Sequence, residues 1–266
     1  MSVGRGLILS VGLGLGLGAC ASSTPPVENP AQAAEDLRYN ELAEDLIVEQ
    51  LTDGVFRHIS SKYVLDSGFV PSNGLLVVAP RGVILIDTPW TEEGAKILLA
   101  WARKTFRREV REVLVTHSHD DRLTGAKIFA AAGATIRALP RTIERARAKK
   151  WEVPATELPA DATLDLLGQS VSVLFPGAAH APDNLVVWLA DKGVLFGGCM
   201  VRTAADEVLG NLADADVESW RPAIKQVIAR FGSAKIVVPG HGDTGGAALL
   251  SHTLKLVERK LNAPPD

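Results

Sequence analysis

Three side chains that can bind a metal ion stand close together at His117, His119 and Asp121. They follow the apolar run 113–116, which has the composition of a buried strand. Imidazole and carboxylate together suit zinc, and a loop after a strand can leave one coordination position free for water or substrate. The stretch therefore predicts a catalytic metal site at the end of a strand.

Three further candidate ligands, His180, Cys199 and His241, each follow an apolar run through a turn that contains glycine. Ligands in α/β proteins gather on loops outside strand ends, and glycine lets the backbone turn sharply there. One such histidine alone would more often be structural. Four histidines and a cysteine in the same context indicate a shared site, whereas His58 and His252 lack this context and are taken as background.

The elements that must position these residues alternate between strands and helices, which favours an α/β layered domain. We expect strands over residues 55–59, 75–79, 83–86, 113–116, 135–138, 171–175, 185–189, 194–196 and 235–238. We expect helices over residues 92–106, 123–132, 141–150, 217–231 and 247–261.

The composition is that of an ordinary globular chain of 266 residues, 47% hydrophobic, with a formal net charge of −3. One domain of this size buries a large core, and nothing demands more than a monomer. The chain has no basic stripe, so neither nucleic acid nor an anionic membrane surface is indicated as a partner. The basic cluster over residues 103–108 is interpreted as the solvated face of a helix.

The N-terminus has the features of a secretory signal: Arg5 precedes an apolar run over residues 7–19 that is too short to span a bilayer. It ends in Leu17-Gly18-Ala19-Cys20, which resembles the bacterial lipobox, where the cysteine receives a lipid. Ala21 next to it is similar to outer-membrane sorting signals, which implies a periplasmic protein anchored by one lipidated terminus. The alternative is an ordinary signal peptide cut after a later alanine.

These features predict three segments: a lipoprotein signal peptide over residues 1–19, a flexible tether over 20–45 and a catalytic domain over 46–266. The tether is rich in Ala, Ser, Pro and Glu, with a short helix expected over residues 31–46. If Cys20 carries lipid, Cys199 is a lone thiol in an oxidising compartment. Metal ligation is one explanation for such a cysteine, and an inert buried thiol is the other.

Taken together, the motifs resemble the metallo-β-lactamase superfamily, and in particular class B β-lactamases with a three-histidine site beside an Asp-Cys-His site, most like the VIM and NDM types. The resemblance covers residues 46–266 and implies a four-layer αββα sandwich. Glyoxalase II, lactonases and related nucleases usually have histidine where this chain has Arg122, and they lack a ligating cysteine. Thr124-Gly125 departs from the two glycines of many members. The motifs that carry the resemblance are residues 117–121, 177–180, 183–184, 197–199, 210–216 and 239–242.

The resemblance implies two Zn²⁺ ions, the first held by His117, His119 and His180. The second is held by Asp121, Cys199 and His241. Zinc lowers the pKa of bound water toward about 7, so a zinc-bound hydroxide would attack the lactam carbonyl while the second zinc stabilises the leaving nitrogen. This implies hydrolysis of penicillins, cephalosporins and carbapenems, and hence antibiotic resistance. The sequence contains neither a Ser-x-x-Lys nor a Gly-x-Ser-x-Gly motif, so the usual signatures of a serine mechanism are absent.

Further roles follow from the same resemblance. Asp121 would also orient the hydroxide, and Asn211 would act near the lactam carbonyl as an oxyanion aid. Arg202 would clamp the substrate carboxylate, unless it is a surface arginine. Asp87 would order the histidine loop as a buried carboxylate. In addition, Tyr63 and Phe69 of a flap over residues 60–71 and Trp90 would contact substrate, although an ordinary hairpin and a core tryptophan are the alternatives.

Two other functions stay open at this point. A relative of the same fold could hydrolyse a lactone or a thioester. A non-catalytic zinc-binding lipoprotein of the envelope would instead need closed, four-coordinate metal sites. Three protein ligands for each metal leave room for water, which favours an enzyme.

Overall fold

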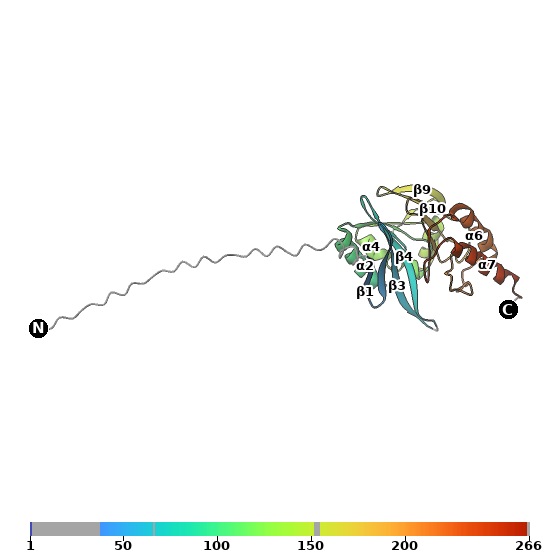
Figure 1. Ribbon diagram of the computed structural model, residues 1–266, viewed down its shortest axis with the longest axis horizontal. Helices are drawn as coiled ribbons and strands as arrows, with labels where there is room; N and C mark the ends of the chain where they lie inside the picture. The colour runs from blue at the N-terminus through green and yellow to red at the C-terminus, as the bar shows by residue number, and fades with distance from the viewer. Residues whose placement is uncertain (2–37, 66, 152–154, 265–266) are drawn as a thin grey trace.

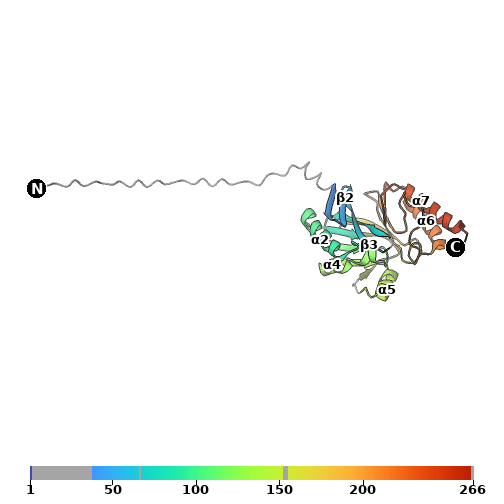
Figure 2. The ribbon, with the colours of Figure 1, turned by 90° about the horizontal axis from the view of Figure 1, so that it is seen from below.

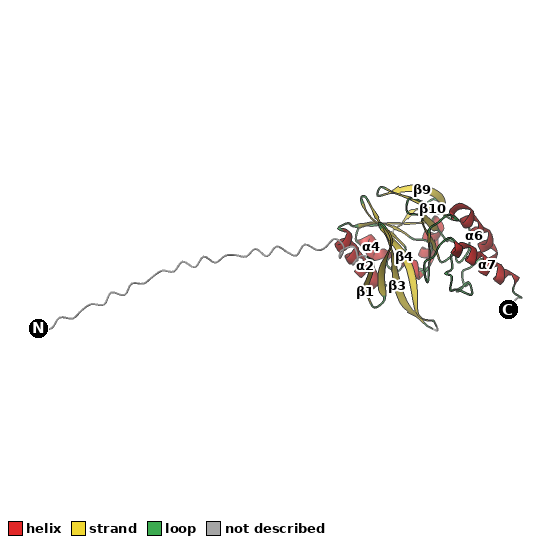
Figure 3. Ribbon diagram, in the orientation of Figure 1, coloured by secondary structure: helices red, strands yellow, loops and turns green. Residues whose placement is uncertain are grey.

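The computed structural model describes Met1 and residues 38–65, 67–151 and 155–264, and among these it forms an eight-stranded and a five-stranded sheet (Figures 1 and 3). The first sheet runs in sequence order: β1 (Tyr39–Ala43), β2 (Leu46–Thr52), β3 (Val55–Val64), β4 (Gly68–Ala79), β5 (Gly82–Ile86), β6 (Val110–Leu114), β7 (Thr135–Ala138) and β8 (Ala155–Glu157). The second has the order β13 (Ile236–Pro239), β12 (Val194–Gly198), β11 (Val186–Leu189), β10 (Gln169–Leu174) and β9 (Asp161–Leu166). The helices are α2 (Glu92–Phe106), α3 (Asp120–Leu123), α4 (Ala126–Ala131), α5 (Pro140–Ala148), α6 (Val217–Phe231) and α7 (Ala248–Asn262).

The two sheets pack face to face, and helices cover their outer faces (Figure 2). One apolar cluster joins the first sheet to α2, α4 and α5, a second fills the space between the sheets, and a third joins the second sheet to α6 and α7. This order of layers confirms the expected αββα sandwich.

Alternation along the strands assigns side chains to these layers, because successive residues of a strand point to opposite faces. In β5, Ile84 and Ile86 belong to the cluster between the sheets, while Val83 and Leu85 pack under the helices. All four are fully buried. A strand that is covered on both sides needs such a continuous apolar sequence.

The strand directions bring the predicted site residues to one edge of both sheets. β5, β6 and β7 are parallel, so Asp87 and the loop from His117 follow adjacent strand ends. In the second sheet β12 and β13 are also parallel, and they are followed by Cys199 and His241. Asn73 of β4 joins the two edges, because its backbone N–H donates to the Gly240 carbonyl at 2.8 Å.

Most expected elements are present within a few residues, and the helices over residues 92–106 and 217–231 have the predicted bounds. Thr91 and Asp216 cap these two helices by accepting backbone N–H bonds from Gly94 and Ser219. The helix expected over residues 123–132 is instead two short helices, which meet at Thr124 and Gly125.

The helix expected over residues 31–46 is wrong where the structure describes it, because Tyr39–Ala43 is strand β1. It pairs antiparallel with β2, with Tyr39 opposite Glu49. The folded domain therefore includes residues that we had assigned to the tether. β2, β8 and β9 were also not predicted; β9 alternates Asp and Thr with small or apolar residues and lies at a sheet edge, where its outward side chains are exposed.

The expected signal peptide, Cys20 and most of the expected tether lie outside the described residues. Among the residues that the structure does describe, none of the helices is both long and apolar enough to cross a bilayer.

Candidate metal centre

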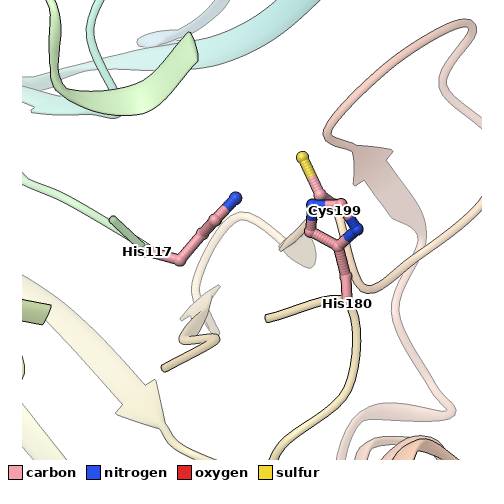
Figure 4. Close-up of side chains that lie close together, drawn as sticks. All are labelled: His117, His180 and Cys199. Carbon is pink, nitrogen blue, oxygen red and sulfur yellow. The ribbon is translucent and has the colours of Figure 1, made fainter. Parts of the chain in front are cut away.

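The three histidines predicted for the first metal converge on one point. Nδ1 of His119 lies 3.1 Å from Nε2 of His117 and 3.2 Å from Nε2 of His180. The rings meet edge to face, with centroids 4.7 to 5.3 Å apart. Figure 4 shows His117, His180 and Cys199 approaching one another from three separate segments of the chain.

The three residues predicted for the second metal form an adjoining group. Oδ2 of Asp121 lies 3.2 Å from Nε2 of His241 and 3.7 Å from Sγ of Cys199. Gly240 makes this approach possible, because a Cβ there would lie 2.5 Å from Sγ and 2.6 Å from the backbone nitrogen of Cys199. Any side chain at position 240 would therefore displace the sulfur or the backbone that carries it.

The donor atoms fit zinc. Four donors placed tetrahedrally about 2.1 Å from a zinc ion are about 3.4 Å apart, close to the separations of the histidine nitrogens here. Each of the groups His117-His119-Asp121, His117-His180-Cys199 and Asp121-Cys199-His241 has its ligand atoms within 4.8 Å of one another. The six side chains thus form one continuous cluster of nitrogen, oxygen and sulfur donors, which suits zinc better than magnesium or calcium.

Burial keeps two of the histidines ready to bind metal. It lowers the pKa of His117 well below its ordinary value, and the neighbouring imidazoles of His180 and His119 oppose protonation further. Burial and the adjacent His119 lower the pKa of His180 to about 3. Because metals bind the neutral ring, these two residues need not lose a proton near pH 7.

Asp121 and His241 behave as an ion pair in the metal-free protein. Burial would raise the pKa of Asp121, but Arg122 and His241 hold it well below its usual range. Burial would lower the pKa of His241, but Cys199 and Asp121 raise it to about 10. Asp121 is therefore a carboxylate under all ordinary conditions, and binding of a metal to His241 must displace a proton.

Arg122 lies directly beneath this second group, with a side chain that is 0% exposed. Its Nη2 lies 2.7 Å from Oδ2 of Asp121 and donates to Sγ of Cys199 at 2.9 Å. Its Nη1 lies 3.4 Å from Oδ2 of Asp87 and donates to the Asn73 carbonyl at 2.6 Å. The arginine thus occupies space beside the ligands without being a ligand, and its charge faces three acidic groups.

Asp87 ties the histidine loop to the first sheet. Its two carboxylate oxygens accept hydrogen bonds from the backbone N–H of Thr116 at 2.8 Å and from its hydroxyl at 2.7 Å. Burial raises the pKa of Asp87 to about 6, although Arg122 and Thr116 oppose the rise. Asp87 therefore holds Thr116, the residue directly before His117, as expected for a carboxylate that orders the histidine loop.

A second set of polar contacts lies behind His119, formed by residues for which the sequence analysis predicted no separate role. Nε2 of His119 lies 3.0 Å from Oδ2 of Asp214, which Arg145 of α5 also contacts at 2.7 Å. Asp183 accepts the backbone N–H of Ser118 at 2.8 Å. These contacts fix the orientation of the ring and of the loop, which is how ligand geometry is usually secured around metals.

Comparison with known proteins identifies the family. Residues 67–241 match the family described as the metallo-beta-lactamase superfamily. The chain is 36% identical over 211 residues to the type 2 metallo-beta-lactamase of Bacillus cereus. The match covers 79% of this chain and 82% of the relative. This chain belongs to the metallo-β-lactamase superfamily.

Solved metallo-β-lactamases share the fold as well. The enzyme from Pontibacter korlensis superposes with a TM-score of 0.77 at 38% identity, over 80% of this chain and 99% of that one. FIM-1 from Pseudomonas aeruginosa, solved in a mono-zinc form, superposes with a TM-score of 0.77 at 32% identity, over 84% of this chain and 100% of that one. The finer likeness to the VIM and NDM types stays a prediction.

The candidate metal ligands of this metallo-β-lactamase fold lie at the floor of a cavity of about 910 Å³. His119, Asp121, His180 and His241 reach its surface, whereas His117 and Cys199 lie behind them and are at most 2% exposed. Its wall includes Lys149 and Trp151, which follow α5, and residues of the flap over 60–71. The cavity is therefore large enough for a bicyclic drug-sized molecule.

The predicted substrate-binding residues lie in different places around the cavity. Arg202, Asn211, Trp90 and Tyr63 line it. Phe69 lies on the flap opposite Tyr63, with ring centroids 5.7 Å apart, but it does not line the cavity.

Trp90 and Asn211, which both line the cavity, differ in how deeply their side chains are buried. Trp90 is 8% exposed and stacks edge to face on His241, so it fills the core as well as lining the cavity. Asn211 is exposed, and its Oδ1 accepts the Ala213 N–H at 3.0 Å, which leaves the amide N–H groups for a ligand. The substrate roles of these residues stay predictions.

Asn73, Arg145 and Asp206 bear on the site and were missed from the sequence. Asn73 donates through Nδ2 to the carbonyls of Pro239 and Gly242, at 2.9 and 2.8 Å. Its signal was a polar pair, Ser72 and Asn73, directly before the apolar run of strand β4. Arg145 and Asp206 gave no signal, because a charged residue on a helix or in a loop is the commonest kind of surface residue.

We predict that His58, which lies on β3 beneath Asp87, makes the metal-free protein less stable in acid. It is buried, its Nε2 lies 3.1 Å from the Asp87 carbonyl oxygen, and burial lowers its pKa to about 4. An unfolded histidine takes up its proton near pH 6.5. The unfolded state therefore binds more protons between pH 6.5 and 4, and the free energy of unfolding falls as pH drops through this window, by about 3 kcal/mol from this residue.

His58→Gln tests this effect, because the amide N–H can still donate to the carbonyl but cannot titrate. Between pH 7.5 and 4, urea unfolding should show the variant losing about 3 kcal/mol less than the parent. Every other ionisable group is present in both proteins, so its contribution cancels in this difference. Equal losses in the two proteins would show that His58 is not the group responsible.

Proposed function

We propose that this protein hydrolyses the amide bond of β-lactam antibiotics with two zinc ions. The observation that carries the proposal is the double cluster of six donor side chains at the floor of one open cavity. The name of the Bacillus cereus relative, a type 2 metallo-beta-lactamase, supports the same reaction. Three protein ligands for each ion leave positions for water and substrate, unlike a closed structural site.

Zinc, when bound, acts as a Lewis acid on the carbonyl and makes water acidic enough to serve as the nucleophile near pH 7. The remaining tasks fall to the chain itself. Asp121 stays a carboxylate, since Arg122 and His241 hold its pKa low, so it can accept a hydrogen bond from the attacking water and orient it. Asn211 faces the same cavity with its amide N–H groups, which can donate to the oxygen that becomes negative.

The wall of the cavity supplies substrate binding. β-Lactams carry a carboxylate, and Arg202 is a guanidinium on the wall that can bind one through two hydrogen bonds. Tyr63, Val64 and Val70 of the flap present apolar surface to the same space, where it can cover ring substituents. A preformed pocket of this kind orients the lactam carbonyl toward the metal ligands.

We also propose that the protein acts in the periplasm as a monomer, anchored to the outer membrane by lipid on Cys20. The sequence Leu17-Gly18-Ala19-Cys20 supports this proposal through its likeness to a lipobox. One lipidated terminus holds a protein at a membrane without a spanning helix.

The zinc-loaded full chain should hydrolyse benzylpenicillin, a cephalosporin and a carbapenem, and should spare a monobactam. Absorbance of the lactam ring measures the reaction, and a chelator should abolish it until zinc is restored. A lactone and a thioester run in parallel separate this activity from those of other hydrolases with this fold. Absence of turnover of every β-lactam at micromolar enzyme would refute the proposal.

Cys199→Ser should weaken the second metal site about 10- to 100-fold and leave the first in place, because a hydroxyl does not ionise near pH 7 as a thiol on zinc does. Metal analysis after dialysis at low micromolar zinc should fall from about two ions per chain to about one. Ser170→Ala, on the exposed side of β10, is the control and should keep both. Retention of two ions by Cys199→Ser would contradict the assignment of Cys199 as a ligand.

Cys20→Ala should move the protein from the membrane fraction to the soluble periplasmic fraction, because the lipid has no attachment site. Fractionation of cells that express each form measures the change, and Cys199→Ser, which keeps Cys20, should stay with the membrane. If the parent chain is already soluble in the periplasm, the ordinary signal peptide is correct.

A further inference from the structure

Each lysine and arginine that lines the cavity in the described part of the chain already has an aspartate partner. Nζ of Lys62 lies 3.0 Å from Asp120, and Nζ of Lys149 lies 3.8 Å from Asp214. Nε of Arg202 lies 2.8 Å from Oδ2 of Asp206. An anionic substrate therefore meets no cation that is not already paired, and the pairing of Arg202 is the tightest of the three.

Arg202 is held in place at both ends. Its backbone N–H donates to the Thr253 hydroxyl of α7 at 2.8 Å. At the other end the guanidinium packs against Gly210, where a Cβ would lie 3.0 Å from Nη1 and 3.1 Å from Nη2. The Arg202 side chain is only 12% exposed, and it lines the cavity.

Asp206 makes two contacts through a single oxygen. Oδ2 lies against Nε of Arg202 and also accepts the backbone N–H of Thr203 at 3.1 Å. The Asp206 backbone is fixed as well, since its N–H donates to the Thr203 carbonyl at 3.2 Å and its carbonyl lies 2.9 Å from Nε2 of His252. The carboxylate is 24% exposed and itself lines the cavity.

We propose that Asp206 has two opposed effects on substrate binding: it positions Arg202, and its negative charge competes with the substrate carboxylate for that arginine. The inference rests on the proposed function, because it takes the carboxylate of a β-lactam as the group that Arg202 binds. Asp206 acts through Arg202 and touches no reacting atom, so it is a positioning residue. Because of its charge, the enzyme binds substrates that carry a carboxylate less tightly than the position of Arg202 alone would allow.

The chemistry of Asn at this position separates the two effects. An amide oxygen can still accept the Thr203 N–H and occupy the place of Oδ2 beside Arg202, while the negative charge disappears. A unit charge about 6 Å from the substrate carboxylate, in surroundings of intermediate polarity, changes affinity by about three- to tenfold. Salt screens part of this effect, because both groups are partly exposed.

The experiment compares Asp206→Asn with the zinc-loaded parent on benzylpenicillin and on its methyl ester, which lacks the carboxylate. We expect the KM for the acid to fall about three- to tenfold, with a much smaller change in kcat, and the KM for the ester to stay the same. In an Arg202→Gln background the same substitution should lose its effect. Glu207→Gln, an exposed neighbour with the same change in charge, is the matched control and should leave both substrates unaffected.

A binding measurement distinguishes this inference from the proposed function. Calorimetry with the ring-opened penicilloate should show tighter binding to Asp206→Asn than to the parent, whether or not the parent turns over any β-lactam. Tighter binding without turnover would remove the proposed function and keep a carboxylate site at Arg202. Turnover with an unchanged KM, or a fall shared by the ester or by Glu207→Gln, would overturn the role of Asp206 alone. Thermal unfolding confirms that each variant is folded.

Discussion

The buried charge of Arg122 is the constraint on which the rest of the site depends. A guanidinium out of contact with water costs several kcal/mol unless anions and acceptors surround it. Asp87, Asp121 and Cys199 supply the acidic groups, and the carbonyls of Asn73 and Gly240 accept further hydrogen bonds from the guanidinium. The same arrangement serves the ligands, because the arginine keeps Asp121 ionised in a place where burial alone would protonate it. Ligand chemistry and folding stability are therefore coupled through one side chain.

That coupling explains why the two sheets must meet in one register. Asp87 belongs to the edge of the first sheet and Cys199 to the edge of the second, and Arg122 touches both. Asn73 adds backbone and amide hydrogen bonds between β4 and the loop after β13. A shift of either sheet by one residue would separate the charges as well as the apolar faces. The candidate metal ligands are thus tied to both sheets through contacts of the protein itself.

The sequence predicted the framework of the fold and the six donor side chains, because both depend on local pattern. Apolar alternation, helix caps and the position of histidines after strands are visible within a few residues of each other. The partners of Arg122 are not, since Cys199 stands 77 positions away and Gly240 stands 118. β1 was missed for a similar reason: its sequence, YNELA, shows no apolar alternation, and its assignment as a strand depends on pairing with β2. The features that the sequence did not predict therefore depend on contacts between residues far apart in the chain.

Gly240 illustrates a difference between the floor and the rim of the active centre in how well each tolerates amino-acid substitutions. A single methyl group there would collide with the sulfur and the backbone of Cys199. The floor is therefore closed to gradual change, since even the smallest substitution acts on a metal ligand. The rim differs, because Tyr63 of the flap is exposed and so is its ring neighbour Phe69. Adaptation to new antibiotics would have to proceed at such rim positions, where many substitutions leave the folded state intact, and it would leave the chemistry inherited and unchanged.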